Sequence, residues 1–516
     1  MQYVPIELYQ LVSDLLNTKT QIRMGQISKL LHELDIMKIR TKVITDDILM
    51  QIKFNRLITL DYCRKQVLLY KAQYRLSQIG ISGLNLVKLY IADNNNISDV
   101  SHMNNLKVLD ISGNCGVNQE GIRGLNLVKL YAGNNKNIYD VSYMTNLQVL
   151  SICGVCAVNQ EGIRNLDLVE LYVCGNKNIY DIAWMTNLKK LYAGRASMIG
   201  QATIKDLNLM ELNVDYNNKI TDISHMTNLK ILHAAWLTGI KQASIQNLNL
   251  IALHIANNRN ITNVEHMSNL KILDISCYEY KRCGVEQSGI KNLDLVELYA
   301  TNNEHVRDVS YMTNLKILNA NFNFFDFFNL SDNYGIEQNG IKNLNLIKLN
   351  IKNNHNINDV SHMTNLKYLN ISGTCAVRQD SMQNLSLTNL DACNNNKIVN
   401  VNHLTSLKKL DIGGTCGVEQ DGIQNLLLRS LRAVNNTKIV DVSFMSTLKK
   451  LNIGGHCGID QIGIENLLLK DLWASGNTKI TDVSFMTTLQ KLNIGGDCGI
   501  GTDGIRNLSL IYINTD

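Results

Sequence analysis

Apolar residues recur along most of this chain at a fixed interval. A Leu-x-Leu pair, most often Leu-Asn-Leu, returns in eight steps of 41 residues, one of 45 and one of 51. The second leucine of the pair falls at Leu86, Leu127, Leu168, Leu209, Leu250, Leu295, Leu346, Leu387, Leu428, Leu469 and Leu510. A second leucine inside each step opens a similar phrase, at Leu106, Leu147, Leu188, Leu229, Leu270, Leu315, Leu366, Leu407, Leu448 and Leu489. The first series opens first-type repeats and the second opens second-type repeats. Together they predict a solenoid of about 21 units, each of 20 or 21 residues.

Each unit begins with an alternation of apolar and polar positions that predicts a short strand. In the phrase LVKLYIADN, residues 86–94, Leu89 and Ile91 point to one side of the strand, and Lys88 and Tyr90 point to the other. Identical strands stacked in parallel bury the leucine side continuously. The opposite side is then expected to form a concave wall.

The two repeat types differ at the turn that follows the strand. First-type repeats place an asparagine eight residues after the opening leucine, at Asn94, Asn135, Asn176, Asn217, Asn258, Asn303, Asn354, Asn395, Asn436 and Asn477. We interpret this column as an asparagine ladder whose amides satisfy backbone groups of the tight turns. Second-type repeats carry cysteine there, at Cys115, Cys156, Cys283, Cys375, Cys416, Cys457 and Cys498.

Both phrases fit L-x-x-L-x-L-x-x-N/C and resemble the leucine-rich-repeat family. The resemblance implies an α/β fold, a horseshoe-shaped leucine-rich-repeat solenoid with parallel strands on its concave face. The segment VNQEGIRGL, residues 117–125, is compatible with one or two helical turns, whereas ISDVSHMNNL, residues 97–106, allows no more than a 3₁₀ turn. The former resembles the cysteine-containing repeats of F-box proteins, and the latter resembles internalin-type repeats.

The N-terminal segment carries no repeat and resembles an F-box. The matching positions are Pro5, Ile6, Glu7, Leu8, Leu11, Leu15, Leu16, Ile22, Arg23, Ile27, Ser28 and Lys29. The resemblance implies that a Skp1-like adaptor docks on Pro5, Ile6, Leu8, Leu11, Leu15, Leu16 and Ile22. The aromatic residue that often follows the Ser-Lys pair is absent, because Leu30, Leu31 and His32 stand there. The alternative is a helical cap that covers the apolar edge of the first repeat.

Three regions follow from these patterns. Residues 1–40 form the F-box-like helical segment, residues 41–83 a degenerate capping repeat, and residues 84–516 the solenoid. The combination of such an N-terminus with asparagine-rich repeats and a single proline also resembles proteins of large DNA viruses of amoebae.

Composition narrows the function classes. Lysine and arginine exceed aspartate and glutamate by five over 516 residues, which is too dilute for a nucleic-acid groove or a membrane surface. We expect no membrane span, no secretory signal and a cytoplasmic location, in the host cytoplasm if the protein is viral. Successive cysteines of the column lie two strands apart, about 10 Å, so they are expected to be free thiols.

No catalytic or cofactor-binding constellation stands out from the repeat. His102, His225, His266 and His362 share one register position, which Tyr143, Trp184, Tyr311, Phe444 and Phe485 also fill. Aspartates such as Asp99, Asp140 and Asp222 recur likewise, as turn residues. A linear column of cysteines cannot converge on a metal ion. We therefore expect no enzyme activity, no cofactor and no metal.

Two departures from the repeat are candidate target-binding elements. Tyrosines occupy the central outward strand position at Tyr90, Tyr131, Tyr172, Tyr192 and Tyr299, where they suit an interface or simply tolerate a half-exposed strand. The two longer steps come from insertions at residues 277–282 and 322–333. The second insertion contains Phe322, Phe324, Phe325, Phe327 and Phe328, which either fold back on the solenoid or serve a partner.

The sequence therefore favours a protein-protein interaction module. The resemblance implies the substrate-recognition subunit of a Skp1–cullin–F-box ubiquitin ligase, holding a protein target on the repeats. The alternative is a binding scaffold without a ubiquitin link, in which the N-terminus is only a cap.

Overall fold

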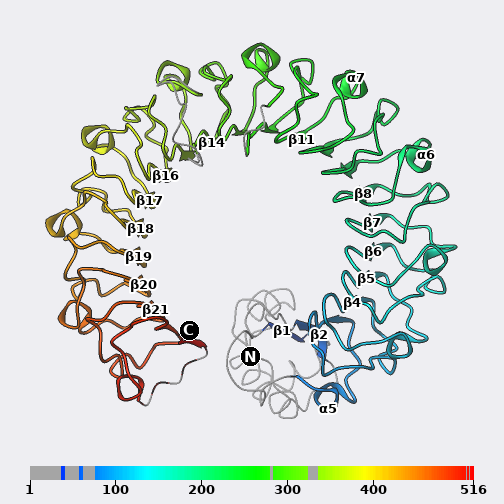
Figure 1. Cartoon of the computed structure of the whole chain (residues 1–516), viewed down its shortest axis with the longest axis horizontal. Coiled ribbons are helices and arrows are strands. Elements are labelled where there is room, and N and C mark those ends of the chain that lie inside the picture. The colour runs from blue at the N-terminus through cyan, green and yellow to red at the C-terminus, as the bar shows by residue number, and fades with distance from the viewer. Residues whose placement is uncertain are drawn as a thin grey trace, which may run out of the picture. The chain divides into compact units, whose positions relative to one another are not determined.

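A computed structural model of the chain describes residues 37–40, 57–61, 76–278, 283–322, 335–506, 508, 510 and 512–515. The chain divides into two compact units, Met1–Leu248 and Asn249–Asp516. In each unit, strands of three to five residues line one side and short helical turns line the other (Figure 1). The adaptor-binding residues proposed between Pro5 and Ile22 lie outside the described residues.

The first unit is a run of parallel strands in sequence order. Every neighbouring pair from β1 to β10 is parallel. The strands are β1 (Met37–Arg40), β2 (Leu57–Asp61), β3 (Lys88–Tyr90), β4 (Val108–Asp110), β5 (Lys129–Tyr131), β6 (Val149–Ser151), β7 (Glu170–Tyr172), β8 (Lys190–Tyr192), β9 (Glu211–Asn213) and β10 (Ile231–His233). The sheet thus begins at Met37, within the last residues of the F-box-like segment.

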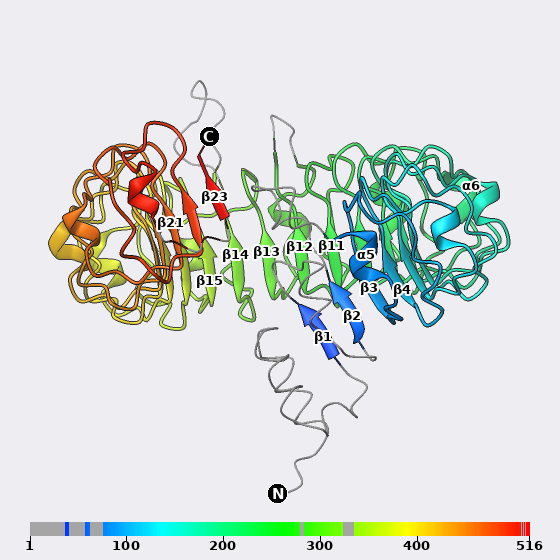
Figure 2. The same ribbon diagram turned by 90° about the horizontal axis from the view of Figure 1, so that it is seen from below.

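The second unit repeats this arrangement, and Figure 2 shows β11 to β15 side by side. Its strands are β11 (Ala252–His254), β12 (Ile272–Asp274), β13 (Glu297–Tyr299), β14 (Ile317–Asn319), β15 (Lys348–Asn350), β16 (Tyr368–Asn370), β17 (Asn389–Asp391), β18 (Lys409–Asp411), β19 (Ser430–Arg432), β20 (Lys450–Asn452), β21 (Asp471–Trp473), β22 (Lys491–Asn493) and β23 (Tyr512–Asn514). Strands β3 to β23 correspond one to one with the 21 predicted repeats, so the leucine-rich-repeat solenoid is confirmed.

The strand alternation produces the core. The central leucines stack in register, with Leu89 opposite Leu109 and Leu109 opposite Leu130. Leu89 and Ile91 are fully buried, whereas Tyr90 between them is half-exposed. The predicted separation into an apolar inner side and a polar outer side is therefore confirmed.

The helical turns distinguish the repeat types as the sequence predicts. Each second-type repeat carries one short helical turn, and first-type repeats have only turns in the described chain. These elements are α5 (Gln78–Ile81), η3 (Glu120–Ile122), η4 (Glu161–Ile163), α6 (Gln201–Ile204), α7 (Gln242–Ile245), η5 (Gln287–Ile290), η6 (Asn339–Ile341), η7 (Gln379–Met382), η8 (Gln420–Ile423), η9 (Ile462–Ile464) and η10 (Asp503–Ile505). Only α5 precedes the first complete repeat.

Polar side chains join each repeat to its neighbours. The ladder asparagine Asn135 is buried, donates from Nδ2 to Ile111 O at 2.9 Å and accepts the Asn137 N–H at 2.8 Å. Next to the short helical turn, Gln119 donates to Asp140 O at 2.7 Å and accepts two backbone N–H groups of the next repeat. The same glutamine contacts recur at Gln78, Gln160, Gln201, Gln287, Gln338, Gln379, Gln420 and Gln461. We call this set the glutamine column, and the sequence analysis did not single it out.

Candidate functional site

Four of the five proposed tyrosines lie together on the concave side of the first unit. Each is the last residue of its strand, on β3, β5, β7 and β8, and is half-exposed. The preceding leucine of each strand is buried, and this fixes the tyrosine on the outward side. Tyr90, Tyr131, Tyr172 and Tyr192 are named together below as the concave tyrosine face.

Tyr172 and Tyr192 form the centre of this face. They are direct partners on adjacent parallel strands, and their ring centroids lie 4.7 Å apart at an interplanar angle of 30°. The ring of His233, at the end of β10, lies 6.2 Å from that of Tyr192. Offset aromatic contacts of this kind favour one orientation of the rings.

Charged neighbours hold the two hydroxyl groups. Tyr172 Oη donates to Glu170 Oε2 at 3.0 Å, and Tyr192 Oη donates to Glu211 Oε1. Lys190 Nζ lies 3.2 Å from Glu211 Oε2 and 3.9 Å from Glu170 Oε1. The result is a network in which both rings have a fixed polar end.

The protonation states of the network follow from these contacts. Burial, and then the hydrogen bonds to Glu170 and Glu211, raise the pKa of Tyr172 and Tyr192, so both remain neutral donors. Burial alone would raise the pKa of Glu211, but hydrogen bonds from Tyr192 and Lys190 outweigh it and lower the pKa below its usual value. The face therefore presents neutral phenols beside the ionised carboxylate of Glu211 at neutral pH.

The structure does not place the other proposed target-binding residues, Tyr299 and the phenylalanines of the second insertion, on the concave tyrosine face. Tyr299 belongs to the second unit, where its hydroxyl donates to Glu297 Oε2 at 2.7 Å. Phe322 is half-buried at the base of the second insertion, and its backbone N–H donates to Lys352 O at 2.8 Å. Phe324, Phe325, Phe327 and Phe328 lie outside the described residues.

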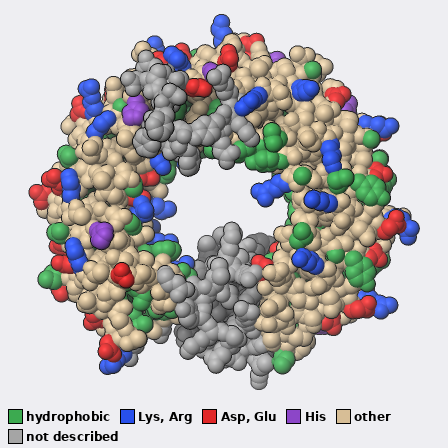
Figure 3. Space-filling model, in the orientation of Figure 1, with side chains coloured by type: hydrophobic (Ala, Val, Ile, Leu, Met, Phe, Trp, Pro, Cys, Tyr) green, Lys and Arg blue, Asp and Glu red, His purple; other side chains and the backbone are tan. Residues whose placement is uncertain are grey.

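The concave side of the second unit has a different chemistry. Arg432 Nη1 pairs with Asp411 Oδ2 at 2.9 Å and reaches Cys393 Sγ at 3.8 Å. Burial, with the nearby Asp411 charge, raises the pKa of Asp391. Trp473 is exposed and donates to Asp471 Oδ1 at 2.8 Å. On the face drawn in Figure 3, acidic and basic side chains are interspersed along each unit, and no continuous basic track is visible on its described surface.

The recurring histidine position has a structural role in several repeats. His102 Nε2 lies 3.3 Å from Ile81 O of the preceding turn, and His225 Nε2 lies 3.2 Å from Ile204 O. Tyr143 and Trp184, in the same register position, donate to backbone carbonyls of the repeat before. Asp99, Asp140 and Asp222 each accept the N–H two residues ahead, as the turn interpretation predicts. No described group of three or more His, Cys, Asp or Glu residues could hold a metal ion.

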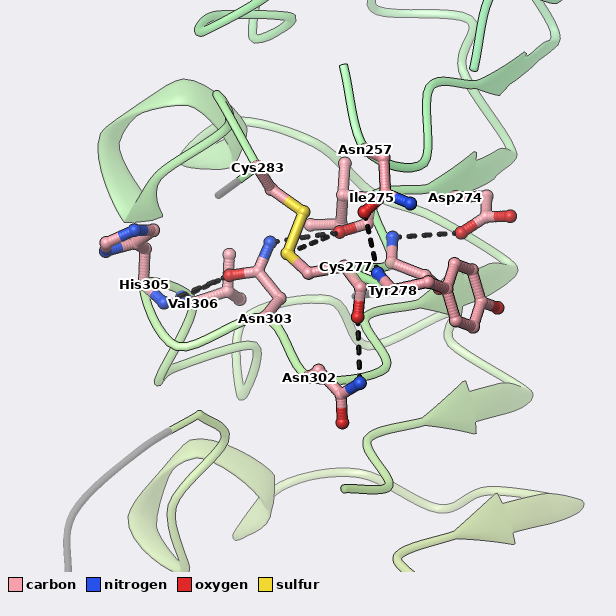
Figure 4. Close-up of a disulfide and its surroundings, with 11 residues drawn as sticks. Asn257, Asp274, Ile275, Cys277, Tyr278, Cys283, Asn302, Asn303, His305 and Val306 are labelled. Atoms are coloured by element: carbon pink, nitrogen blue, oxygen red, sulfur yellow. Dashed lines mark hydrogen bonds between the residues drawn. A yellow bond between two sulfur atoms is a disulfide. The ribbon is translucent and has the colours of Figure 1, made fainter. Parts of the chain in front are cut away.

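One expectation about the cysteines is wrong. Figure 4 shows a disulfide between Cys277 and Cys283, whose Cα atoms lie 5.7 Å apart. Cysteines of successive second-type repeats are too far apart to bond, but Cys277 and Cys283 stand at the two ends of the first insertion, which brings their Cα atoms within bonding range. Asn302 Nδ2 also donates to Cys277 O at 2.8 Å, which ties the base of this insertion to the next repeat. The other cysteines of the described chain are free, while Cys63 lies outside it.

The fold and its concave surface define the chain as a leucine-rich-repeat solenoid. No protein-family model and no curated protein matches it. Similar solved structures include an internalin (InlF) from Listeria monocytogenes, with 18% identity over 64% of this chain and 87% of that chain and a TM-score of 0.33. A leucine-rich-repeat protein of Leptospira interrogans has 18% identity over 81% of this chain and 91% of its own, with a TM-score of 0.30. TLR13, solved in complex with ssRNA13, has 16% identity over 88% of this chain and 83% of its own, with a TM-score of 0.49. None of the described helices is long and apolar enough to cross a membrane.

Proposed function

We propose that this chain is a protein-binding scaffold that holds its target against the concave tyrosine face. The observation that carries the proposal is the Tyr172–Tyr192 pair, with its hydroxyl groups already held by Glu170 and Glu211. Tyrosines ordered before binding lose little rotamer freedom when a partner arrives, and this favours affinity. Aromatic side chains also dominate the energy of typical protein interfaces.

The experiment compares two matched double variants. Replacing Tyr172 and Tyr192 with alanine should weaken target capture by about tenfold or more, since true hot-spot residues each contribute about 2 kcal/mol or more. Tyr139→Ala with Tyr180→Ala is the control, because both tyrosines are exposed on the turns between strands and outside the concave tyrosine face. Proteins retained from a lysate by the parent chain are quantified for both variants. The proposal is contradicted if both double variants lose target capture equally, or if neither variant loses it.

The finer proposal is that the scaffold serves a Skp1–cullin–F-box ubiquitin ligase. It is supported by the F-box-like positions from Pro5 to Ile22 in the sequence, which would dock a Skp1-like adaptor. Purified adaptor should bind the parent chain and should not bind a variant with Leu8, Leu11 and Ile22 replaced by glutamate. Circular dichroism should show that the repeats of this variant remain folded. Failure of the parent chain to bind adaptor would exclude the ligase role and leave the scaffold proposal intact.

A scaffold without a ubiquitin link is the second candidate. It is favoured by the pairing of β1 with β2 and of β2 with β3, because a cap must continue the sheet to cover the first repeat. Deleting residues 1–61, which removes β1 and β2 together with the F-box-like segment, separates the two. A cap predicts a lower melting temperature for the repeats, whereas an adaptor-docking segment predicts loss of adaptor binding with little change in melting temperature.

A further inference from the structure

Unusual backbone conformations in the first unit gather at one place outside the concave tyrosine face. Among the residues that the structure describes, thirteen other than glycine have positive φ, and nine of these are asparagine or aspartate, which tolerate this region. The other four are Arg195, Ala196, Tyr216 and Trp236, with φ between 52° and 63°. All four lie in the turns that follow β8, β9 and β10.

The comparison with neighbouring repeats shows how far these turns depart from the pattern. Arg195 and Trp236 stand where the two preceding second-type repeats have Gly113 and Gly154, also at positive φ. Tyr216 stands where first-type repeats have Asp93 or Asn134. Large side chains in this conformation are disfavoured, and such outliers cluster at ligand-binding sites. We therefore ask what the large side chains of Arg195, Tyr216 and Trp236 contribute that glycine or asparagine at the same positions would not.

The large side chains build a surface depression. Tyr216 and Trp236 stack with ring centroids 5.2 Å apart and planes 15° from parallel. Tyr216, Met198 and Leu237 line an open depression of about 840 Å³, and their exposed fractions are 39%, 42% and 64%. Apolar side chains exposed together in this way mark a surface that a partner covers.

The charge of the depression has one sign. Lys177, Arg195 and Lys219 line it, and none of its described lining residues is acidic. None of the three forms an ion pair with a carboxylate within the described part of the chain. Lys219 Nζ lies instead 2.8 Å from Met198 Sδ, a weak acceptor that leaves the charge uncompensated. The depression thus joins an apolar floor to three cations that lack counter-charges.

We propose that this depression binds an acidic segment of a partner protein. An apolar side chain of the segment covers Met198, Tyr216 and Leu237, and flanking carboxylates meet Lys177, Arg195 and Lys219. Charge-assisted hydrogen bonds to carboxylates are the stronger kind, and the apolar contact supplies specificity for a side chain between them. This site is separate from the concave tyrosine face and does not depend on it.

A protein segment fits the depression better than a nucleic acid. Tyr216 and Trp236 stack on each other, so each ring has one face already covered and no slot for a base lies between them. Met198 and Leu237 are aliphatic and offer no ring on which a base could stack. A nucleic acid is therefore an outcome of the test and not a part of the proposal.

The test uses the full chain and a panel of fluorescein-labelled peptides. Each peptide has a central pair of leucine or phenylalanine residues flanked by glutamates. Matched peptides replace the central pair with serine or the glutamates with lysine. We expect saturable binding of the acidic apolar peptides, measured by fluorescence anisotropy, and weakening at higher salt because exposed charges are screened. Both kinds of matched peptide should bind at least about tenfold more weakly, which corresponds to 1.4 kcal/mol.

Variants assign the binding to the depression. Lys177→Glu with Lys219→Glu should weaken the acidic peptides by about tenfold or more through charge reversal. Lys136→Glu with Lys479→Glu is the matched control, since these lysines occupy the same turn positions in other repeats. Leu237→Ser tests the apolar contact separately and, at 64% exposure, should not disturb the fold.

Four results would overturn the proposal. The first is no saturable binding of any acidic apolar peptide by the folded parent chain. The second is equal weakening in the charge-reversal variant and in its control. The third is binding of a uridine oligonucleotide that displaces the peptides and is lost in Lys177→Glu with Lys219→Glu. Loss of binding in Tyr172→Ala with Tyr192→Ala would instead place the peptides on the concave face, which also contradicts the proposal.

Discussion

The ladder asparagines carry backbone hydrogen bonds that nothing else nearby can replace. Asn354 is fully buried, donates to Ala320 O and Ile336 O at 3.3 and 3.2 Å, and accepts the N–H groups of Asn356 and Ile357. Removing its amide leaves these groups buried without partners. Because an unsatisfied buried group costs about 1–3 kcal/mol, the side chain stabilises its two repeats strongly.

Asn354→Ala should therefore lower the free energy of unfolding of the second unit by about 3 kcal/mol. Urea unfolding followed by circular dichroism measures the effect. Asn365→Ala removes an exposed amide from the same region and should change the free energy of unfolding by about 0.5 kcal/mol or less. Similar values for the two variants would show that the ladder is not a source of stability.

The thiols differ in their ionisation according to their place in the repeat. A hydrogen bond from Cys174, on the neighbouring strand turn, stabilises the thiolate of Cys153, and the nearby Arg195 charge acts in the same direction, so the pKa of Cys153 is lowered. Burial raises the pKa of Cys115, Cys156, Cys375 and Cys416 to about 11. Thiolate is the reactive form, so these sites should react differently at neutral pH.

Iodoacetamide at pH 7 should modify Cys153 faster than any of those four buried cysteines in the native protein. As the pH rises, the rate at Cys153 should reach its plateau first, while the buried thiols stay largely protonated below a pH of about 11. Peptide mass spectrometry after timed quenching gives the rate at each site. Cys174→Ala, which removes the donor, should slow the reaction at Cys153, and an unchanged rate would contradict the hydrogen-bond explanation.

At the scale of single residues, the sequence predicted the roles of residues that recur in every repeat. It did not predict contacts and backbone angles that depend on how neighbouring repeats pack. The asparagine ladder was predictable because its position is invariant across ten repeats. The glutamine column had a similar signal, since glutamine follows the cysteine turn in nearly every second-type repeat, but its side-chain contacts span two repeats. The positive φ of Arg195, Tyr216 and Trp236 could not be predicted, because no residue type there favours it.

The strands and turns are the elements that the period specifies most completely. The alternation of apolar and polar residues predicts one short strand in each unit of about 20 residues. The rest of a second-type unit has room for one turn of helix, and both elements are observed. The two insertions interrupt this repeat period, and different contacts hold the ends of each insertion together. The first is closed by the bond between Cys277 and Cys283. At the second, Asn353 Nδ2 donates to Phe322 O at 2.9 Å, and a Cβ at Gly335 would meet Phe322 Cζ at 2.5 Å.

The base contacts of the second insertion predict the result of removing it. Residues 323–334 can be replaced by the Thr-Cys pair found at the same turn in residues 374–375, which restores a step of 41 residues. Because Phe322 and Asn353 remain, the melting temperature should change by no more than about 2 °C, consistent with the slow growth of closure entropy with loop length. A drop much beyond this would mean that the insertion supports the fold. Normal stability with weakened target capture would assign it to binding.

The molecule as a whole is assembled from two kinds of junction between repeats. From a second-type to a first-type repeat, Gln420 bonds to Asp441 and Asn436 donates back to Ile412 O. From a first-type to a second-type repeat, Asn435 Oδ1 accepts the His456 N–H at 2.9 Å. Each junction works only between unlike repeats, because each repeat type carries one half of each set of contacts.

Deletions of one and of two repeats should therefore have opposite outcomes. Removing residues 428–468 takes out one repeat of each type and leaves Gln420 facing another first-type repeat, so a cooperative unfolding transition should persist. Removing residues 428–447 alone places two second-type repeats side by side. Gln420, Ile412 O and the His456 N–H then lose the partners that they have in the deleted repeat. We expect loss of that transition in thermal unfolding. Equal tolerance of both deletions would show that the two types are interchangeable.

The alternation of junctions also limits how a gene for such a protein can change in length. Unequal recombination between copies of the repeat is free to add or remove any number of units, but only an even number preserves every junction. Lineages should then differ by whole pairs, and a single-unit loss should be eliminated by selection even when it keeps the reading frame. Shorter length changes should survive at the two insertions, residues 277–282 and 322–333, because these interrupt the regular step and leave both kinds of junction in place.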